Sequence, residues 1–280
     1  MTDTPRVAVI SGGGSGMGLE ATTQLTKRGG WNVHILDVSE ERGKEVVQRL
    51  GSTVTFHKTD VTSYASLSSA FEKIFDIEGR LDFVYANAGI KETGDLYAVA
   101  KDTKAPPEVN QLTVDLNLKS VINQSYLASH YFQLSPSKGQ GTNLVMTGSA
   151  GSVYPLDSAP MYAASKFGVL GFCWSIAKMY KQRFGIRVNT VLPAPVPTNL
   201  VTKEEWAGFD SSLFTPPSAI VDVVLKLVDG KDMKDSNGTA FAGKDCVGKA
   251  VEVIQGDYYF RTPMAWCNDK MFQAMAANDL

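Results

Sequence analysis

The chain has 280 residues, of which 44% are hydrophobic and 20% charged, with a formal net charge of -2; these values are ordinary for a globular protein with a sizeable core. This charge excludes a basic surface for nucleic acid or an anionic membrane, and the three scattered cysteines and three dispersed histidines predict neither a disulfide framework nor a metal site. The N-terminus has no signal-peptide pattern and no apolar run approaches the ~20 residues that cross a bilayer, so we expect a soluble cytoplasmic protein.

The first predicted element is a β-branched run, Arg6 to Ser11, of the continuous apolar kind that forms a buried parallel strand. It leads directly into Gly-Gly-Gly-Ser-Gly-Met-Gly at 12–18, and a helical pattern follows. A glycine-rich turn between a strand and a helix lets the backbone approach a pyrophosphate at the helix N-terminus. The spacing Gly-x-x-x-Gly-x-Gly differs from Gly-x-Gly-x-x-Gly and lacks the Gly-Lys-Ser/Thr ending of a P-loop. The predicted cofactor-binding residues of this turn are Gly12, Gly14, Ser15, Gly16, Met17 and Gly18; the alternative is a merely flexible turn.

The second predicted strand, 32–37, ends in Asp37, which lies 19 residues beyond Gly18. An acidic residue at this place accepts hydrogen bonds from the adenosine ribose hydroxyls and repels a 2′-phosphate. Asp37 therefore favours NAD over NADP, and no arginine stands at or just after it. The alternative is that Asp37 only caps the helix predicted at 40–50.

The third predicted strand, 53–59, is followed by Asp60 and Val61 at its carboxyl end, where an open α/β sheet presents its ligand crevice. Asp60 there either contacts the adenine or simply caps the helix predicted at 63–75. Further strands and helices alternate along the chain. The remaining predicted strands are 81–86, 143–147, 186–192 and 249–255, and the remaining predicted helices are 108–134, the one carrying Tyr162, and 216–227.

This alternation predicts the fold class α/β. We expect a single doubly wound Rossmann-type domain over residues 1–280, with a seven-stranded, mostly parallel sheet and helices on both faces. The irregular segment 199–217 contains Trp206, Phe209 and Phe214. Aromatic residues in a loop after a strand suit a lid over an apolar substrate, and the alternative is a small satellite cluster.

Tyr162 and Lys166 lie four residues apart in a predicted helix, so their side chains project from one face. The ammonium is then close enough to stabilise a phenolate, which alone titrates near pH ~10. An isolated Tyr-x-x-x-Lys is a weak signal, because a half-buried aromatic and a solvated lysine produce the same pattern. Asn117 lies inside the preceding predicted helix, where an amide has no propensity advantage, and Ser149 follows the predicted strand at 143–147.

Several motifs together resemble the short-chain dehydrogenase/reductase family. These are Ser-Gly-Gly-Gly-Ser-Gly-Met-Gly at 11–18, Asn-Ala-Gly at 87–89, Ser149, and Tyr-Ala-Ala-Ser-Lys at 162–166, in the family's order and spacing. The resemblance covers roughly residues 5 to 200. The tail at 248–260, Gly-Lys-Ala-Val-Glu-Val-Ile-Gln-Gly-Asp-Tyr-Tyr-Phe, resembles the NAD-dependent hydroxyprostaglandin dehydrogenase-like branch.

The resemblance implies four catalytic residues. Tyr162 is the general base in alcohol oxidation or the acid in ketone reduction, and Lys166 lowers its pKa and binds the nicotinamide ribose. Ser149 holds the substrate oxygen, and Asn117 holds a water that links Lys166 to solvent. The resemblance also implies a second set of residues that contact the cofactor, with Val196 and Thr198 at its carboxamide end. This set is Asn87, Ala88, Gly89, Tyr162, Lys166, Pro193, Val196 and Thr198.

Two positions depart from the family's pattern. The common Ser-Ser pair is Gly148-Ser149 here, which leaves Ser149 as the only natural candidate at its position. The usual Pro-Gly after the sixth predicted strand is Pro193-Ala194, followed by two more prolines. These prolines stiffen the segment that enters the predicted lid.

The leading hypothesis is an NAD-dependent oxidoreductase that interconverts a secondary alcohol and a ketone on an apolar small molecule. One alternative is an NADPH-dependent biosynthetic ketoreductase, and another is a non-catalytic scaffold or sensor that binds nicotinamide. The apolar helices after Asn117 and around Tyr162 predict a homodimer or homotetramer.

Overall fold

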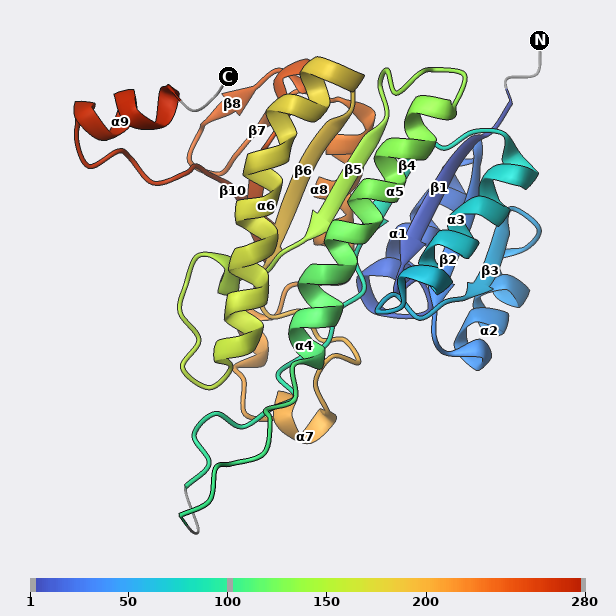
Figure 1. Ribbon diagram of the computed structural model, residues 1–280. Helices are drawn as coiled ribbons and strands as arrows, with labels where there is room; N and C mark the ends of the chain where they lie inside the picture. The colour runs from blue at the N-terminus through green and yellow to red at the C-terminus, as the bar shows by residue number, and fades with distance from the viewer. Residues whose placement is uncertain (1–3, 100–102, 278–280) are drawn as a thin grey trace.

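The computed structural model describes residues 4–99 and 103–277. Its centre is an eight-stranded sheet in the order β10-β9-β6-β5-β4-β1-β2-β3, and every neighbouring pair is parallel except β9 and β10 (Figure 1). The strands of this sheet are β1 (Arg6–Ser11), β2 (Trp31–Asp37), β3 (Val54–Lys58), β4 (Phe83–Ala86), β5 (Asn143–Thr147), β6 (Arg187–Pro193), β9 (Ala250–Ile254) and β10 (Asp257–Arg261). Two short strands, β7 (Met233–Lys234) and β8 (Ala240–Phe241), pair separately.

Helices cover both faces of the sheet, because the central strands are apolar on both sides. On one face, Ala8 and Ile10 of β1 pack with residues of α1, α2 and α8; on the other, Val7 and Val9 pack with α3, α5 and α6. The helices are α1 (Gly16–Arg28), α2 (Glu40–Leu50), α3 (Tyr64–Glu78), α4 (Leu112–Val114), α5 (Ser120–Leu134), α6 (Pro160–Phe184), α7 (Lys203–Trp206), α8 (Pro217–Asp229) and α9 (Asp269–Ala276). Figure 1 shows α3, α5 and α6 on the near side of the sheet.

The α/β architecture with helices on both faces is confirmed, but the sheet has one strand more than the predicted seven. The extra strand is β10, in the aromatic tail. It turns back after β9 and pairs antiparallel with it, from Asp257 opposite Ile254 to Arg261 opposite Ala250. A two-residue connection at Gln255 and Gly256 makes this hairpin, and Gln255 has a positive φ of 54°.

The long helix predicted at 108–134 starts later and is not continuous. It consists of α4, a π-helical turn at Asp115–Lys119, and α5. The π turn contains Asn117, whose amide bonds to the backbone N–H and carbonyl oxygen of Ile90. Wide turns of this kind often occur at functional sites.

One stretch of the described residues, Ser211–Asp229, is apolar and long enough to pass as a membrane span, which corrects the expectation that no such run exists. Only its α8 part is a regular helix, with 13 residues. At 1.5 Å per residue, α8 reaches about 20 Å, less than the ~30 Å of a bilayer core. Ile220, Val221 and Val224 on α8 are buried against the sheet, so α8 packs as a core helix.

Candidate active site

The residues singled out from the sequence meet at the carboxyl edge of the parallel strands. Strands β1, β2, β4, β5 and β6 run in the same direction, so the segments that follow them emerge together. In Figure 1 this edge lies at the lower end of the sheet, beside α4 and α7. It is the edge at which open α/β sheets bind ligands.

The glycine turn after β1 has the shape of an anion cradle. Gly12 and Gly16 have φ values of 67° and 52°, a region that favours glycine. A Cβ on Gly18 would lie 2.3 Å from the Gly12 carbonyl oxygen, so the helix and the turn approach each other as only glycine allows. The N-cap residue of α1, Ser15, makes no side-chain cap, and the first turn carries no acidic residue. The N–H groups at the N-terminus of α1 therefore face the glycine turn, and the helix dipole makes this end of the helix positive.

Asp37, at the end of β2, belongs to this cradle. Its Oδ2 accepts the Gly14 N–H at 3.0 Å and its Oδ1 accepts the Ser39 N–H at 3.0 Å. Ser39, not Asp37, is the N-cap of α2, so the structure does not support the capping alternative for Asp37. A Cβ on Gly14 would meet Asp37 Oδ2 at 2.7 Å, which shows how closely the carboxylate lies to the turn.

Arg42 is a charged neighbour of Asp37 that the local sequence did not reveal. It stands on the first turn of α2, and its guanidinium lies 3.6 Å from Asp37 Oδ1. Its Nε is buried and has no hydrogen-bond partner among the described residues. A cation five residues beyond the carboxylate weakens the repulsion that Asp37 offers to a 2′-phosphate.

Asp60 and Val61 lie in the turn after β3. The Asp60 carboxylate accepts the Thr62 N–H at 2.9 Å and the Thr62 hydroxyl at 2.7 Å, while Val61 is buried. Ser63 caps α3, so Asp60 braces the turn before that helix rather than capping it. Its side chain is exposed, and no described contact joins it to the glycine turn.

Asn87, directly after β4, bonds to the last residues of β1 and β5. Its Nδ2 donates to the Ser11 carbonyl oxygen at 3.1 Å and its Oδ1 accepts the Thr147 hydroxyl at 3.1 Å. The Ser11 hydroxyl accepts the N–H groups of Asn87 and Ala88 at 3.0 and 3.1 Å. Ser11 and Thr147 thus hold the Asn-Ala-Gly segment in place. We did not identify either as a site residue from the sequence, because each contacts strands that are distant in the chain.

Tyr162 and Lys166 lie one turn apart on α6, with Lys166 Nζ 5.7 Å from the centre of the Tyr162 ring. Lys166 is buried and donates a hydrogen bond to the Thr147 carbonyl oxygen at 2.8 Å. Burial lowers the pKa of Lys166 to about 8. Burial also raises the pKa of Tyr162, opposed by a hydrogen bond with Ser149. The three side chains predicted to act together are therefore close to one another.

Ser149 is held by a short 3₁₀ turn, Ala150–Ser152, directly after β5. Its Oγ accepts the Gly151 N–H at 3.0 Å, and its own N–H donates to Ser152 Oγ at 3.1 Å. The Ser152 hydroxyl in turn donates to the Lys166 carbonyl oxygen at 2.8 Å. Ser152 therefore connects the turn that carries Ser149 to the helix that carries Lys166.

Asn117 lies near Lys166 and bonds to Ser165, the residue before it on α6. Its Oδ1 accepts the Ile90 N–H at 2.9 Å, and its Nδ2 donates to the Ile90 carbonyl oxygen at 2.8 Å and to Ser165 Oγ at 3.3 Å. A Cβ on Gly89 would lie 3.4 Å from Asn117 Oδ1 and 3.6 Å from Lys166 Nζ. Gly89 is therefore close to both the Asn117 amide and the Lys166 ammonium.

The predicted cofactor-binding residues at the end of β6 and after it lie in different surroundings. Thr198 faces the glycine turn, since a Cβ on Gly16 would meet its Cγ2 at 3.0 Å. Pro193 ends the strand, and Val196 is buried in the core on the side of α1 and α8. The structure therefore brings Thr198 to the predicted cofactor site and places Val196 in the packing behind it.

The predicted lid, 199–217, is built around Trp206. Its ring lies 5.1 Å from that of Phe209 and 5.2 Å from that of Phe214, and its Nε1 donates to the Thr198 carbonyl oxygen at 3.0 Å. The aromatic residues thus form a cluster of their own, as the alternative reading expected. The cluster is nevertheless attached to Thr198, which places it next to the cofactor segment.

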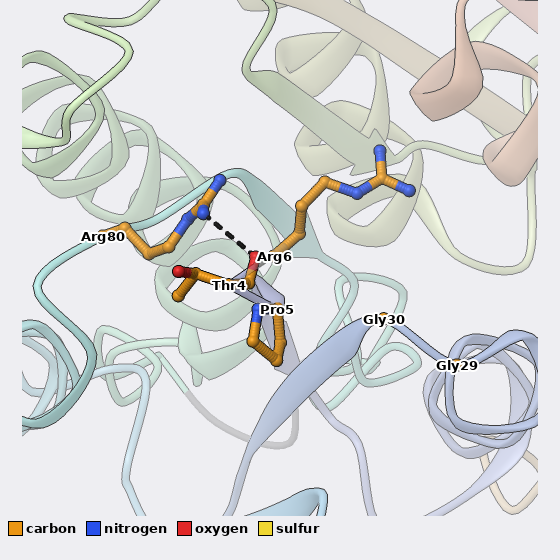
Figure 2. Close-up of a pocket in the computed structure, with 6 residues that line it drawn as sticks. All are labelled: Thr4, Pro5, Arg6, Gly29, Gly30 and Arg80. Carbon is orange, nitrogen blue, oxygen red and sulfur yellow. Dashed lines mark hydrogen bonds between the residues drawn. The ribbon is translucent and has the colours of Figure 1, made fainter. Parts of the chain in front are cut away.

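A separate hollow of about 490 Å³ lies at the other end of β1, lined by Arg6, Arg80 and residues beside them. Figure 2 shows Arg80 bonded to the Thr4 carbonyl oxygen, at 3.3 Å. Arg6 makes a cation–π contact, with its guanidinium 4.0 Å from the centre of the Trp31 ring. This hollow lies at the amino end of β1, whereas the residues described above lie at the carboxyl ends of the strands, so the two are remote from each other.

His34 and His57, which are far apart in the sequence, are neighbours in the structure. His34 Nδ1 and His57 Nε2 are 2.9 Å apart, and His34 Nε2 lies 2.9 Å from Glu78 Oε1. Strands β2 and β3 pair side by side, which brings together two residues that the sequence separates. Among the described residues, no group of three or more His, Cys, Asp or Glu side chains is arranged to hold a metal ion.

Comparison with known proteins identifies relatives of this chain. The model of the short chain dehydrogenase family matches residues 6–207. The short-chain dehydrogenase/reductase prx7 of Penicillium rubens is 39% identical over 271 residues, covering 93% of this chain and 95% of its own. The NAD(+) 15-hydroxyprostaglandin dehydrogenase of Rattus norvegicus is 29% identical, covering 72% and 74%.

Two solved structures have the same fold. A 3-ketoacyl-(acyl-carrier-protein) reductase from Brucella melitensis, complexed with NADH, superposes with a TM-score of 0.74 at 22% identity, over 90% of this chain and 97% of its own. A short chain dehydrogenase from Burkholderia cenocepacia, in complex with NADP, gives 0.72 at 23%, over 90% and 97%. At these identities the likeness concerns the fold. The family match over most of the chain and the relative at 39% identity together show that this protein belongs to the short-chain dehydrogenase/reductase family.

Proposed function

We propose that this member of an oxidoreductase family acting on alcohol and ketone groups uses NAD to interconvert a secondary alcohol and a ketone on an apolar small molecule. The observation that carries the proposal is the grouping of Ser149, Tyr162 and Lys166. Lys166 is linked through Thr147 and Asn87 to Ser11, the residue before the glycine turn, and Asp37 bonds to the same turn at Gly14. When bound, the nicotinamide accepts a hydride from the alcohol carbon or returns it to the ketone carbon.

The side chains of the chain itself carry the proton. In the oxidation direction Tyr162 takes the hydroxyl proton of the substrate, and in reduction it gives that proton to the carbonyl oxygen. Ser149 donates a hydrogen bond to the same substrate oxygen, which stabilises the charge that develops on it. Lys166 stabilises the phenolate, since an ammonium favours a nearby anion. We assign Asn117 the role of fixing the segment after Gly89, on the strength of its two bonds to Ile90.

The glycine turn suits a dinucleotide. The uncapped N-terminus of α1 favours a pyrophosphate, and Asp37 at the end of β2 suits the two ribose hydroxyls of an adenosine. Asn87, Ala88 and Gly89 are assigned to the nicotinamide side with Thr198. Asp37 supports NAD, whereas its neighbour Arg42 supports the second candidate, an NADPH-dependent ketoreductase.

The apolar character of the substrate rests on the segment at 199–217. Phe209, which belongs to the Trp206 cluster attached to Thr198, and Leu213 are about half exposed there. Exposed aromatic and aliphatic groups next to a reactive centre favour apolar ligands over sugars. We propose that this segment closes over the substrate.

The test is to follow absorbance during NAD reduction, and separately NADP reduction, across secondary alcohols of graded size and polarity. We expect NAD-dependent turnover on large apolar alcohols and little on sugar-like ones. Turnover with NADP alone would favour the ketoreductase, and tight NAD binding without turnover on any alcohol or ketone would favour a sensor or scaffold.

We further propose a homodimer or homotetramer in the cytoplasm, with residues 1–280 as one domain. Exposed apolar side chains support the assembly: Ile122 and Tyr126 on α5, and Phe167 and Met179 on α6. The cysteines are unpaired, which suits a reducing compartment. Light scattering at several concentrations measures the oligomer, and a monomer at all of them would reject it.

A further inference from the structure

The helix that carries Tyr162 cannot cap its own N-terminus. Its N-cap residue is Ala159, which has no side-chain acceptor, and Pro160 in the first turn has no N–H. The first free donors of α6 are therefore the N–H groups of Met161 and Tyr162, at the second and third helical positions. These are the positions that a capping side chain normally satisfies.

Glu92 supplies the missing cap from another part of the chain. Its Oε1 accepts the Met161 N–H at 3.2 Å and its Oε2 accepts the Tyr162 N–H at 2.6 Å. Glu92 belongs to the loop after β4 and is 70 residues from Tyr162. A carboxylate that accepts two backbone donors at a helix N-terminus makes charge-assisted bonds and also interacts with the helix dipole.

The same loop is fixed to the turn that holds Asn117. Ile90 bonds to the Asn117 amide, the Thr113 hydroxyl donates to the Lys91 carbonyl oxygen at 3.0 Å, and Thr93 Oγ1 lies 2.9 Å from Thr113 Oγ1. Beyond this anchor the loop is exposed, with Leu96 and Tyr97 half or more open to solvent. The anchored part of the loop thus spans from the Asn117 turn to the helix of Tyr162.

The contact between loop and helix is close. A Cβ on Gly94 would lie 2.5 Å from Met161 Cε and 2.7 Å from Val109 Cγ2. No larger residue fits at Gly94 without a shift, so the loop lies directly against the first turn of α6. The loop therefore lies against the turn of α6 on which Tyr162 stands.

We propose that Glu92 is a positioning residue for Tyr162: its carboxylate fixes the first turn of α6 to the loop after β4, so that the loop and the phenol keep one geometry around the substrate. This inference rests on the proposed function for its kinetic consequences. Its structural consequence, the joining of loop and helix, does not depend on any activity.

The first experiment measures backbone hydrogen exchange in the protein without cofactor. In Glu92→Ala we expect faster exchange at 161–163 and also at 90–94, because both segments lose the bond that joins them. The matched control is Asp95→Asn, since Asp95 accepts the Tyr97 N–H at 2.9 Å within the loop. Exchange at 161–163 should stay unchanged in this control. Unaltered exchange in Glu92→Ala would overturn the proposal.

The second experiment separates positioning from mere capping. Ala159→Asp gives α6 a local N-cap, and we combine it with Glu92→Ala. The double variant should regain the thermal stability and the protection at 161–163, while kcat/KM for the alcohol with the highest turnover stays about tenfold below that of the unmodified protein. The dissociation constant of NAD, measured by protein fluorescence, should change less than about twofold in all variants.

Full recovery of kcat/KM in the double variant would show that Glu92 only caps the helix, and would overturn the coupling to the loop. Wild-type kcat/KM in Glu92→Ala would overturn the positioning role directly. If the unmodified protein oxidises or reduces nothing in the panel, the proposed function fails, and the exchange experiment still decides whether Glu92 joins the loop to the helix.

Discussion

Lys166 Nζ lies 5.7 Å from the centre of the Tyr162 ring, within a site where burial shifts the two pKa values in opposite directions. The pKa of Lys166 falls to about 8, whereas that of Tyr162 rises above its usual 10. In the protein without cofactor the ammonium therefore loses its proton at a lower pH than the phenol does. Tyr162 is protonated at neutral pH, and a further positive charge beside it is needed to stabilise the phenolate.

Replacing Tyr162 by phenylalanine tests its role in proton transfer. We expect kcat/KM to fall by about 10²-fold or more, the usual contribution of a positioned acid or base. NAD affinity should stay nearly unchanged, because the ring remains in place. Steady-state absorbance kinetics and fluorescence titration measure the two quantities, and retained turnover in Tyr162→Phe would remove the assignment.

Replacing Lys166 by methionine should stabilise the protein without cofactor at pH 7. The folded pKa of about 8 lies below the usual 10.5, so at pH 7 both states are charged and folding bears the cost of burying the charge. The gain in the free energy of unfolding is on the order of 2 kcal/mol after the loss of the Thr147 hydrogen bond. Stability of the unmodified protein should rise as pH increases from about 8 to 10.5, and the gain should shrink over that window.

Urea denaturation at pH 7 and pH 10 checks this prediction. Lys226→Met serves as control, since Lys226 on α8 is half-buried, with its Nζ 5.1 Å from the centre of the Tyr258 ring. A Lys166→Met variant that is less stable than the parent at pH 7 would show that the ammonium contributes more through its bond to Thr147 than it costs through burial.

Asp37 and Arg42 should together decide the choice of cofactor. In the unmodified protein the Arg42 guanidinium lies 3.6 Å from Asp37 Oδ1. Asp37→Ser removes the repulsion toward a 2′-phosphate and leaves Arg42 without its carboxylate partner. We expect NAD affinity to fall about tenfold, equal to about 1.4 kcal/mol, and NADP affinity to rise. Adding Arg42→Gln should abolish the rise in NADP affinity, as measured by fluorescence titration. A parent protein that already prefers NADP would contradict the role given to Asp37.

The pair of His34 and His57 should make stability dependent on pH. Burial and the nearby charges of His34 and Lys73 lower the pKa of His57 to about 4, and burial lowers that of His34 against the opposing effect of Glu78. Below pH 6.5 the unfolded chain takes up protons that the folded pair does not. The free energy of unfolding therefore falls as pH drops from 6.5 to about 4 through His57, and the lowered pKa of His34 contributes a loss of the same sign.

The variant His57→Gln should show a shallower loss of stability over the same range, measured by urea denaturation at pH 7, 5.5 and 4.5. His130→Gln is the matched control, since His130 stacks edge-on against Tyr131 outside this pair. Equal pH dependence in the parent and in His57→Gln would show that other groups cause it.

Patterns of a few residues were sufficient to predict the elements that position the site. The apolar run 6–11 followed by glycines predicted β1 and the turn before α1, and the spacing of Tyr162 and Lys166 predicted a shared helix face. Steric rules for glycine and the 3.6-residue period act locally, so they can be read without a structure. The helix predicted from 108 began only at Leu112, because helix ends depend on contacts as well as on propensity.

The sequence by itself was sufficient to predict the α/β class, the family and the glycine turn, and to single out Asn117, Ser149 and Lys166 together with Tyr162. Only the tertiary structure decided the strand β10, the contact of Arg42 with Asp37, the pairing of His34 with His57, and the cap that Glu92 provides to the helix of Tyr162. Each of these depends on the path that brings separate segments of the chain together. Local sequence patterns do not predict these contacts, because a hydrogen bond or ion pair between distant segments leaves no periodicity in either of them.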